Sequence, residues 1–235
     1  MNNETIKQNF LLIKSRIEQT AKKFSKNFEK IKIIAVSKTH TPQAIVAAYE
    51  AGARIFGENY VQELTEKQKI LEEKGIIPEW HFIGHLQTNK VKYITPFVSL
   101  IHSVDSEKLA LEISRQAQKH NRTIDILMQV NTSGEISKSG CEPEESVDLA
   151  EKIIKIPNIK LLGLMTIGTF SDNETIIRRE FRLLKSILDE INSKLSINLT
   201  ELSMGMSHDF EIAIEEGSTM VRIGTAIFGE RDYSH

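Results

Sequence analysis

Residues 31–38 read IKIIAVSK, a nearly continuous apolar run that ends in a lysine. Such a run suits a strand covered on both faces, as the strands of parallel sheets are. The next stretch, TPQAIVAAYEAG at 41–52, has a helical pattern, with Thr41 as N-cap, Pro42 at the first helical position and Gly52 just past the end. A buried strand followed at once by a helix predicts an α/β fold.

The same cycle recurs along the whole chain. Further strands are predicted at 54–59, 79–84, 99–104, 125–131, 160–168, 201–206 and 219–229. Helices are predicted at 60–74, 88–95, 105–120, 143–155, 174–194 and 208–216, with an extra N-terminal helix at 4–27. The alternation indicates a parallel sheet, and eight strands favour a closed (β/α)8 TIM barrel over the alternative, an open doubly wound sheet. We expect residues 1–235 to form a single domain.

Composition narrows the class of protein. The chain has 235 residues, of which 40% are hydrophobic and 26% charged, as is usual for a soluble domain with one core. A net charge of −2 offers no basic field for nucleic acid or an anionic membrane, so a phosphate ligand needs a local site. The single cysteine, Cys141, cannot form an intramolecular disulfide, which fits a reducing compartment. Without a signal peptide or an apolar span, we expect a cytoplasmic protein.

In such barrels the active site lies at the carboxyl ends of the strands. The residues expected there are Lys38, Glu58, Asn59, Gly84, His85, His102, Ser103, Asn131, Thr166, Gly168, Ser203, Ser207, Arg222, Gly224 and Thr225. Lys38 follows its strand directly, and an unprotonated lysine is the side chain that readily forms a Schiff base with a carbonyl. The alternative is a solvated lysine that happens to end a strand.

Two turns supply a second feature, SMGMSHD at 203–209 and RIGT at 222–225. They follow the seventh and eighth predicted strands, where barrels frequently bind phosphate. Gly205 and Gly224 allow close backbone approach to a ligand, and Ser207 is placed to cap the following helix. The alternative is a pair of ordinary tight turns.

A phosphate site beside a strand-end lysine suggests a phosphorylated carbonyl ligand. Pyridoxal 5′-phosphate (PLP) has this chemistry, and so has the substrate of a Schiff-base sugar-phosphate aldolase. Arg222 lies two residues before Gly224 and so shares its face of the strand. Because arginine stays charged, it would keep a neighbouring pyridine nitrogen unprotonated and weaken the ring as an electron sink. This favours PLP held without strong catalysis.

Several stretches resemble the YggS/PROSC family of pyridoxal phosphate homeostasis proteins over essentially the full length. They are AVSKTH (35–40), FGENYVQE (56–63), WHFIGHLQTNK (80–90), SKSG (137–140), GLMTI (163–167), LSMGMSHD (202–209) and GSTMVRIGTAIFGERDY (217–233). The resemblance implies PLP fold type III, a barrel like the N-terminal domain of alanine racemase. Departures are TNK at 88–90, where SNK is common, and the SHD ending at 207–209.

The resemblance also implies roles for particular residues. Lys38 carries the Schiff base, Arg222 faces the pyridine nitrogen, and the phosphate is held by Ser203, Met206, Ser207, Gly224 and Thr225. The ring pocket is lined by Asn59, Ile83 and Met165. Lys138 is also a family position, whose role stays open between ligand binding and a solvated or structural lysine.

Other reactive side chains are given plainer roles. His208 is expected in the exposed first turn of a helix. His81 and His85 lack the company of other metal ligands, so we expect core packing or a supporting hydrogen bond, and no metal site. A nucleophilic Cys141 would need a nearby base, and none is evident.

The function implied is PLP binding in intracellular vitamin B6 homeostasis, without established catalysis and with apo-PLP enzymes as candidate recipients. A weak PLP-dependent amino-acid racemase and a PLP-free aldolase are the alternatives. Racemisation needs a second base opposite the lysine. Tyr49, Tyr60 and Tyr93 fall in helical patterns, Tyr233 lies near the end of the sequence, and no segment corresponds to the second domain of alanine racemase. We therefore expect a monomer that is not an enzyme.

Overall fold

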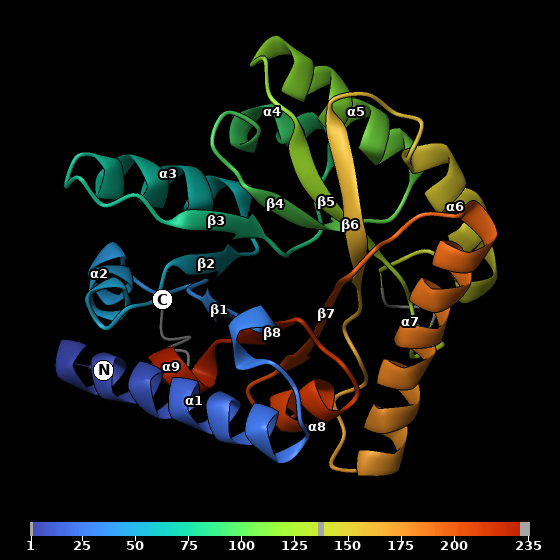
Figure 1. The fold of residues 1–235 in the computed structure, drawn as a ribbon. Helices are drawn as coiled ribbons and strands as arrows, with labels where there is room; N and C mark the ends of the chain where they lie inside the picture. Colours follow the sequence, from blue (N-terminus) through green and yellow to red (C-terminus); the bar gives the residue numbers. More distant parts are fainter. Residues whose placement is uncertain (1, 136–138, 231–235) are drawn as a thin grey trace.

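The fold is a closed barrel of eight parallel strands that pair in chain order, β1 with β2 through to β8 with β1 (Figure 1). The computed structural model describes residues 2–135 and 139–230. The strands are β1 Lys32–Val36, β2 Ile55–Glu58, β3 Glu79–Phe82, β4 Leu100–Val104, β5 Ile124–Gln129, β6 Ile159–Met165, β7 Glu201–Met206 and β8 Met220–Ile223. The predicted TIM barrel is confirmed, and the open sheet is excluded.

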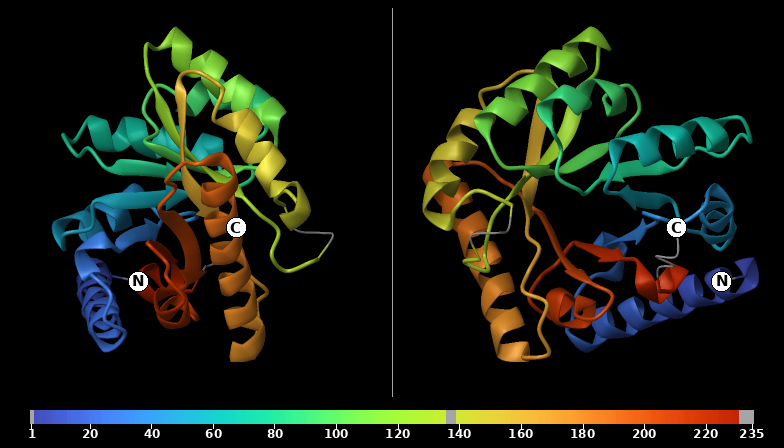
Figure 2. Two further views of the ribbon diagram at one scale, coloured as in Figure 1. Left: turned by 45° about the vertical axis from the view of Figure 1, so that its right-hand side comes forward. Right: turned by 180° about the vertical axis from the view of Figure 1, so that it is seen from behind.

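Helices surround the strands as an outer ring (Figure 2). The α-helices are α1 Asn3–Lys23, α2 Pro42–Glu50, α3 Val61–Glu72, α4 Val91–Ile94, α5 Glu107–Lys119, α6 Ser146–Ile153, α7 Glu174–Leu195, α8 Phe210–Glu215 and α9 Thr225–Phe228. Short 3-10 turns cover Phe28–Lys30, Thr88–Lys90 and Pro143–Glu145. The predicted N-cap and proline of α2 are confirmed, since Thr41 Oγ1 accepts from Ala44 N and Pro42 opens the helix.

The extra N-terminal helix is part of the packed molecule. Ile6, Phe10, Ile13 and Ile17 recur on one face of α1 and are all buried. This face packs against α2, α8 and α9, so α1 covers the side of the barrel where the first and last strands meet (Figure 1).

Two separate apolar layers result from the alternation of side chains along each strand. In β1, Ile34 and Val36 point into the barrel, whereas Ala35 faces the helices. The inward layer is formed by Ile34, Val36, Ile83, Leu100, Leu127, Met165 and Met220. The larger outward layer joins the sheet to the helices, so the interior is a filled core and its upper end forms the floor of any site.

One predicted element is wrong. The strand expected over 219–229 ends at Ile223, and residues 225–228 form α9 instead. The apolar run continues past the strand, so hydrophobicity alone gives no sign of the break, while Gly224 makes the turn. The predicted helix at 208–216 begins later, at Phe210, and the predicted helix at 4–27 ends at Lys23.

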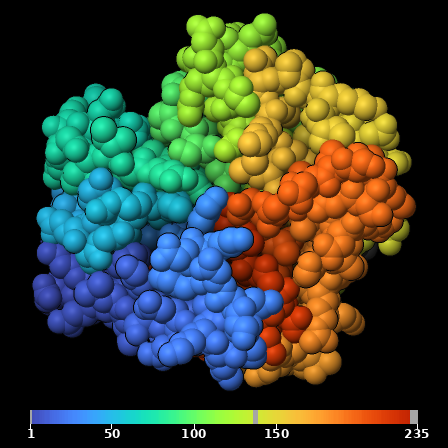
Figure 3. Space-filling view, viewed as in Figure 1, coloured from blue at the N-terminus to red at the C-terminus, as the bar shows by residue number. Residues whose placement is uncertain are grey.

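Closure of the barrel pairs the first strand, β1, with the last strand, β8. In register, Ile34 of β1 lies opposite Arg222 of β8, and Ala35 lies opposite Ile223. Figure 3 shows the blue N-terminal segments directly beside the red C-terminal ones. Among the described residues, no helix is long and apolar enough to cross a membrane.

Candidate functional site

A cavity of about 240 Å³ opens at the carboxyl ends of the strands. Its walls are Val36, Lys38, Asn59, Ile83, Ile167, Phe170, Met206, Ser207, His208, Arg222, Gly224 and Thr225. The structure thus brings together Lys38, Asn59, Ile83, Met206, Ser207, Arg222, Gly224 and Thr225, eight of the ten residues predicted for the site.

The backbone around Lys38 is fixed by a buried ionic cluster. Lys67 Nζ donates to the Ser37 carbonyl at 2.6 Å and to Glu58 Oε1 at 2.7 Å. Ser37 Oγ donates to the same carboxylate oxygen, and Thr39 N donates to Glu63. Thr39 has a φ of 67°, a left-handed conformation that a threonine keeps only where its surroundings hold it. The two residues that flank Lys38, Ser37 and Thr39, are therefore held in place by hydrogen bonds to side chains of β2 and α3.

Burial raises the pKa of the Glu58 carboxyl to about 7, although the Lys67 ammonium opposes this shift. One oxygen, Oε1, takes all the recorded hydrogen bonds, while the buried Oε2 has no hydrogen-bond partner among the described residues. Sequence reasoning placed Glu58 at a strand end but gave it no role.

Beside the carboxyl end of β1, the two predicted turns are tied together by Ser207. Its Oγ accepts from Gly224 N at 3.2 Å and from Ala226 N at 3.3 Å. Within residues 2–135 and 139–230, no acceptor is recorded for the backbone amides of Ser207 and Thr225, which both lie on the cavity wall. Ser207 does not cap α8 as expected, because its hydroxyl is used across the two turns, and Asp209 occupies the N-cap position.

Gly205 has a different role from the one predicted. Its φ is +94°, and a Cβ at this position would lie 2.5 Å from the Ala213 Cβ. The glycine therefore allows α8 to pack closely on β7, and does not provide an approach for a ligand. Gly224 does line the cavity.

Arg222 forms part of the cavity floor and is 5% exposed. Its NH1 donates to Ser203 Oγ at 2.7 Å and its NH2 donates to the Thr166 carbonyl at 2.8 Å. Burial lowers the pKa of the guanidinium to about 10, and the Asp209 carboxylate opposes that shift. Arg222 therefore stays positively charged near neutral pH.

The two remaining predicted residues lie beneath the cavity. Met165 belongs to the apolar layer inside the barrel and is fully buried. Ser203 is also fully buried and stands between Arg222 and His102. Neither lines the cavity, so any effect on a ligand would pass through the residues above them.

Asn59 presents an unused polar atom. Its buried Oδ1 has no hydrogen-bond partner among the described residues, and the residue lines the cavity. The Asn59 backbone packs directly on Gly84, where a side chain would collide with its carbonyl. The glycine thus fixes the position of the asparagine.

Sequence reasoning missed the rim of the cavity. Phe170 is 81% exposed, and its ring centroid lies 4.8 Å from that of His208. His208 is exposed, as expected, but it lies in the turn before α8 and not in the helix. Ile167 also belongs to the rim. An exposed phenylalanine in a polar loop is the one sequence signal that could have found this part.

The other predicted residues have varied outcomes. His81 is buried and hydrogen-bonded to His102, as expected of a supporting histidine, whereas His85 is exposed. Cys141 is buried, and burial raises the pKa of its thiol to about 12, so the unreactive interpretation fits. Lys138 lies outside the described residues. The described part of the chain holds no cluster of three or more potential metal ligands.

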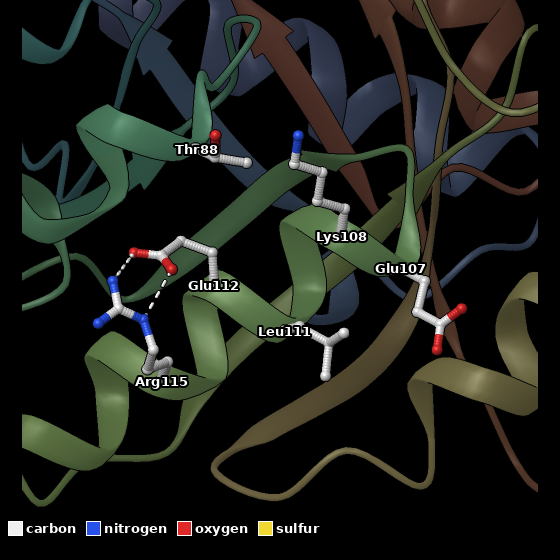
Figure 4. Close-up of a pocket in the computed structure, with 6 residues that line it drawn as sticks. All are labelled: Thr88, Glu107, Lys108, Leu111, Glu112 and Arg115. Carbon is white, nitrogen blue, oxygen red and sulfur yellow. Dashed lines mark hydrogen bonds and ion pairs between the residues drawn. The ribbon is translucent and has the colours of Figure 1, made fainter.

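A wider hollow of about 590 Å³ lies elsewhere, on the outer surface beside α5. Figure 4 shows its exposed lining, in which the Arg115 guanidinium pairs with the Glu112 carboxylate. Two of its four charged side chains therefore pair with each other, and none of the strand-end residues lines it. The smaller cavity, with a lysine, a buried arginine and unpaired amides, is the better candidate.

The fold and the site define the class, a parallel barrel in which a strand-end lysine shares a cavity with backbone amide donors. Residues 12–232 match the sequence family described as alanine racemase, N-terminal domain. The pyridoxal phosphate homeostasis protein of Aquifex aeolicus is 46% identical over 218 residues, which cover 93% of this chain and 95% of that protein. The chain therefore belongs to the family of pyridoxal phosphate homeostasis proteins.

Solved structures agree with this assignment. PipY of Synechococcus elongatus, determined with PLP bound, is 34% identical with a TM-score of 0.80, over 91% of this chain and 99% of that one. Alanine racemase of Corynebacterium glutamicum is 17% identical with a TM-score of 0.73 and shares the fold. This chain covers 64% of that enzyme.

Proposed function

We propose that this protein binds PLP in the strand-end cavity, with a Schiff base on Lys38, and serves PLP homeostasis without catalysing a reaction. The observation that carries the proposal is the single cavity that joins Lys38, the charged Arg222 and the Ser207–Thr225 turns. The family names of the relatives and the PLP in PipY support the same cofactor.

The residues present fit the chemical groups of PLP. The unpaired amides of Ser207 and Thr225 are suited to a phosphate, because backbone N–H groups bind anions without a side-chain charge. The orphaned Asn59 Oδ1 is an acceptor for a ring hydroxyl group. The Lys38 amine, when unprotonated, would hold the aldehyde carbon of PLP as a Schiff base, with loss of one water that hydrolysis would restore.

The arrangement favours binding of PLP over PLP-dependent catalysis. When bound, PLP would supply an electron sink for carbanions, and this sink is strongest when the ring nitrogen is protonated. Arg222 donates hydrogen bonds and remains charged, so it offers no proton acceptor or carboxylate counter-charge to a protonated ring. The tyrosines of the described chain, Tyr49, Tyr60 and Tyr93, line no part of the cavity.

An absorption spectrum tests the binding proposal. Added PLP should give the visible band of a lysine Schiff base, and Lys38→Ala should abolish it. Lys108→Ala is the matched control, since Lys108 lines the wider hollow beside α5. A band that survives Lys38→Ala, or one that never appears in the unaltered protein, contradicts the proposal.

Two assays separate homeostasis from catalysis. The protein should leave the α-protons of an amino-acid panel unexchanged in deuterated water, whereas racemase-type activity would replace them. PLP transfer to an apo-enzyme is then compared with transfer from free PLP. Equal rates would exclude delivery and leave storage.

A further inference from the structure

A continuous hydrogen-bonded chain of polar side chains runs through the apolar interior of the barrel. Glu79 begins β3 and is half exposed, and its carboxylate lies 3.1 Å from His81 Nε2. His81 Nδ1 lies 3.0 Å from His102 Nε2. His102 Nδ1 lies 2.9 Å from Ser203 Oγ, which accepts from Arg222 NH1 at 2.7 Å. This hydrogen-bonded chain therefore joins a carboxylate at the amino end of the barrel to the arginine below the cavity.

The groups at the two ends of this hydrogen-bonded chain determine which atom in each of its bonds carries the hydrogen. The Arg222 guanidinium has only donors, so Ser203 Oγ must accept from it and keeps its own hydrogen for His102 Nδ1. His102 then carries its proton on Nε2 and donates to His81 Nδ1. His81 in turn carries its proton on Nε2 and donates to Glu79, an ionised carboxylate that only accepts.

Both imidazoles are neutral in this scheme. Burial lowers the pKa of His81 and lowers that of His102 well below its ordinary value. The His81 hydrogen bond lowers the pKa of Glu79, which keeps it ionised at neutral pH. The reversed order would set His81 Nε2, as an acceptor, against the Glu79 carboxylate with no proton between them. It would also turn the Ser203 hydroxyl hydrogen away from His102, the one acceptor that the described residues offer it.

We propose that Glu79, His81, His102 and Ser203 are positioning residues for Arg222, forming a one-directional hydrogen-bond chain that fixes the guanidinium below the cavity. A chain whose bonds all point the same way is polarised cooperatively. Their influence on PLP rests on the proposed function, whereas the chain itself does not.

Nitrogen NMR of the histidines, on protein without added PLP, tests the direction of the chain. His81 and His102 should both appear as neutral rings protonated on Nε2. A proton on Nδ1 of either ring would overturn the proposal. This measurement stands even if PLP does not bind.

Glu79→Gln tests the role of the carboxylate, because an amide group can also donate and so permits the reversed order. The variant should show mixed histidine tautomers and about fivefold weaker PLP binding, the lower end of usual coupling between sites. Glu201→Gln is the matched control, since Glu201 lies at the same end of the barrel and is bonded to Thr219 and Lys32. Equal tautomers and equal affinities in the two variants would contradict the proposal.

A double-mutant cycle shows whether the effect passes through the chain. In a Ser203→Ala background, Glu79→Gln should change PLP affinity no more than Glu201→Gln does. A fivefold loss that persists without Ser203 would mean that Glu79 acts by another route, and the positioning role would be wrong. Failure of the Schiff-base band in every form of the protein, with the NMR result as expected, would instead count against the proposed function.

Discussion

At the scale of single residues, the site depends on groups whose partners lie far away in the sequence. The sequence placed Lys38, Arg222 and Ser207 correctly at strand ends, because buried runs mark where each strand stops. It could not show that Lys67 reaches back to the Ser37 carbonyl, or that Ser203 joins Arg222 to His102. Such contacts depend on side-chain directions in the closed barrel, and an isolated histidine in an apolar strand carries no sign of its partner.

Glu58 should make stability depend on pH. Its folded pKa of about 7 lies above the ordinary 4.5, so the folded state binds this proton more tightly. Its contribution to the free energy of unfolding is therefore full below about pH 4.5 and is lost as the pH rises through about 7. The loss amounts to about 3 kcal/mol.

Urea denaturation at several pH values checks this, with Glu58→Gln as the comparison. The free-energy difference between the unaltered protein and the variant should decline from pH 4.5 to pH 8. Parallel curves for the two proteins would show that Glu58 does not titrate in this range.

Ser207→Ala removes the acceptor shared by two backbone amides, those of Gly224 and Ala226. We expect the free energy of unfolding to fall by about 1–2 kcal/mol, the usual effect of leaving such groups unpaired. Ser186→Ala, on the exposed side of α7, is the control. Equal denaturation midpoints for both variants would contradict the bridging role of Ser207.

At the scale of elements, periodicity and capping predicted every strand and most helices, because each strand is a short buried run. The end of the chain was harder. Residues 219–229 stay mostly apolar on both sides of Gly224, yet β8 gives way to α9 after Ile223. The change of direction comes from Gly224 and from the hydrogen bonds to Ser207, which no local pattern reveals.

The junction of β7 with α8 offers a test at this scale. Gly205→Ala combines a strained positive φ with a collision against Ala213, and should lower the free energy of unfolding by about 2 kcal/mol or more. Gly75→Ala is matched, since Gly75 has a φ of +70° but no atom within 4 Å of the added Cβ. Gly75→Ala should lower the free energy of unfolding by less, because it introduces backbone strain without a collision. Urea denaturation measures both losses. Equal losses would exclude the packing role.

At the scale of the whole molecule, eight predicted cycles were enough to favour closure, and pairing of β1 with β8 makes the sheet continuous. We propose that residues 1–235 form one domain and that the protein is a monomer. Sedimentation at several concentrations checks the second point, and a mass above 26.7 kDa would contradict it.

A single domain should unfold in one cooperative transition. Trp80, the only tryptophan, is buried in β3 and reports the barrel by fluorescence, whereas far-ultraviolet circular dichroism reports mainly the helices. The two thermal curves should coincide. Separate midpoints would indicate parts that unfold independently.

Closure between β1 and β8 also sets an order in time. Lys38 leaves the ribosome early, while the turn at Gly224 and Thr225 emerges only with the last strand. Since domains are completed as synthesis proceeds and long-range strand pairing is slow, the cavity cannot exist on a partly made chain. A nascent chain therefore displays the lysine without the C-terminal part of the cavity, and selective capture of a ligand begins only after synthesis has passed β8.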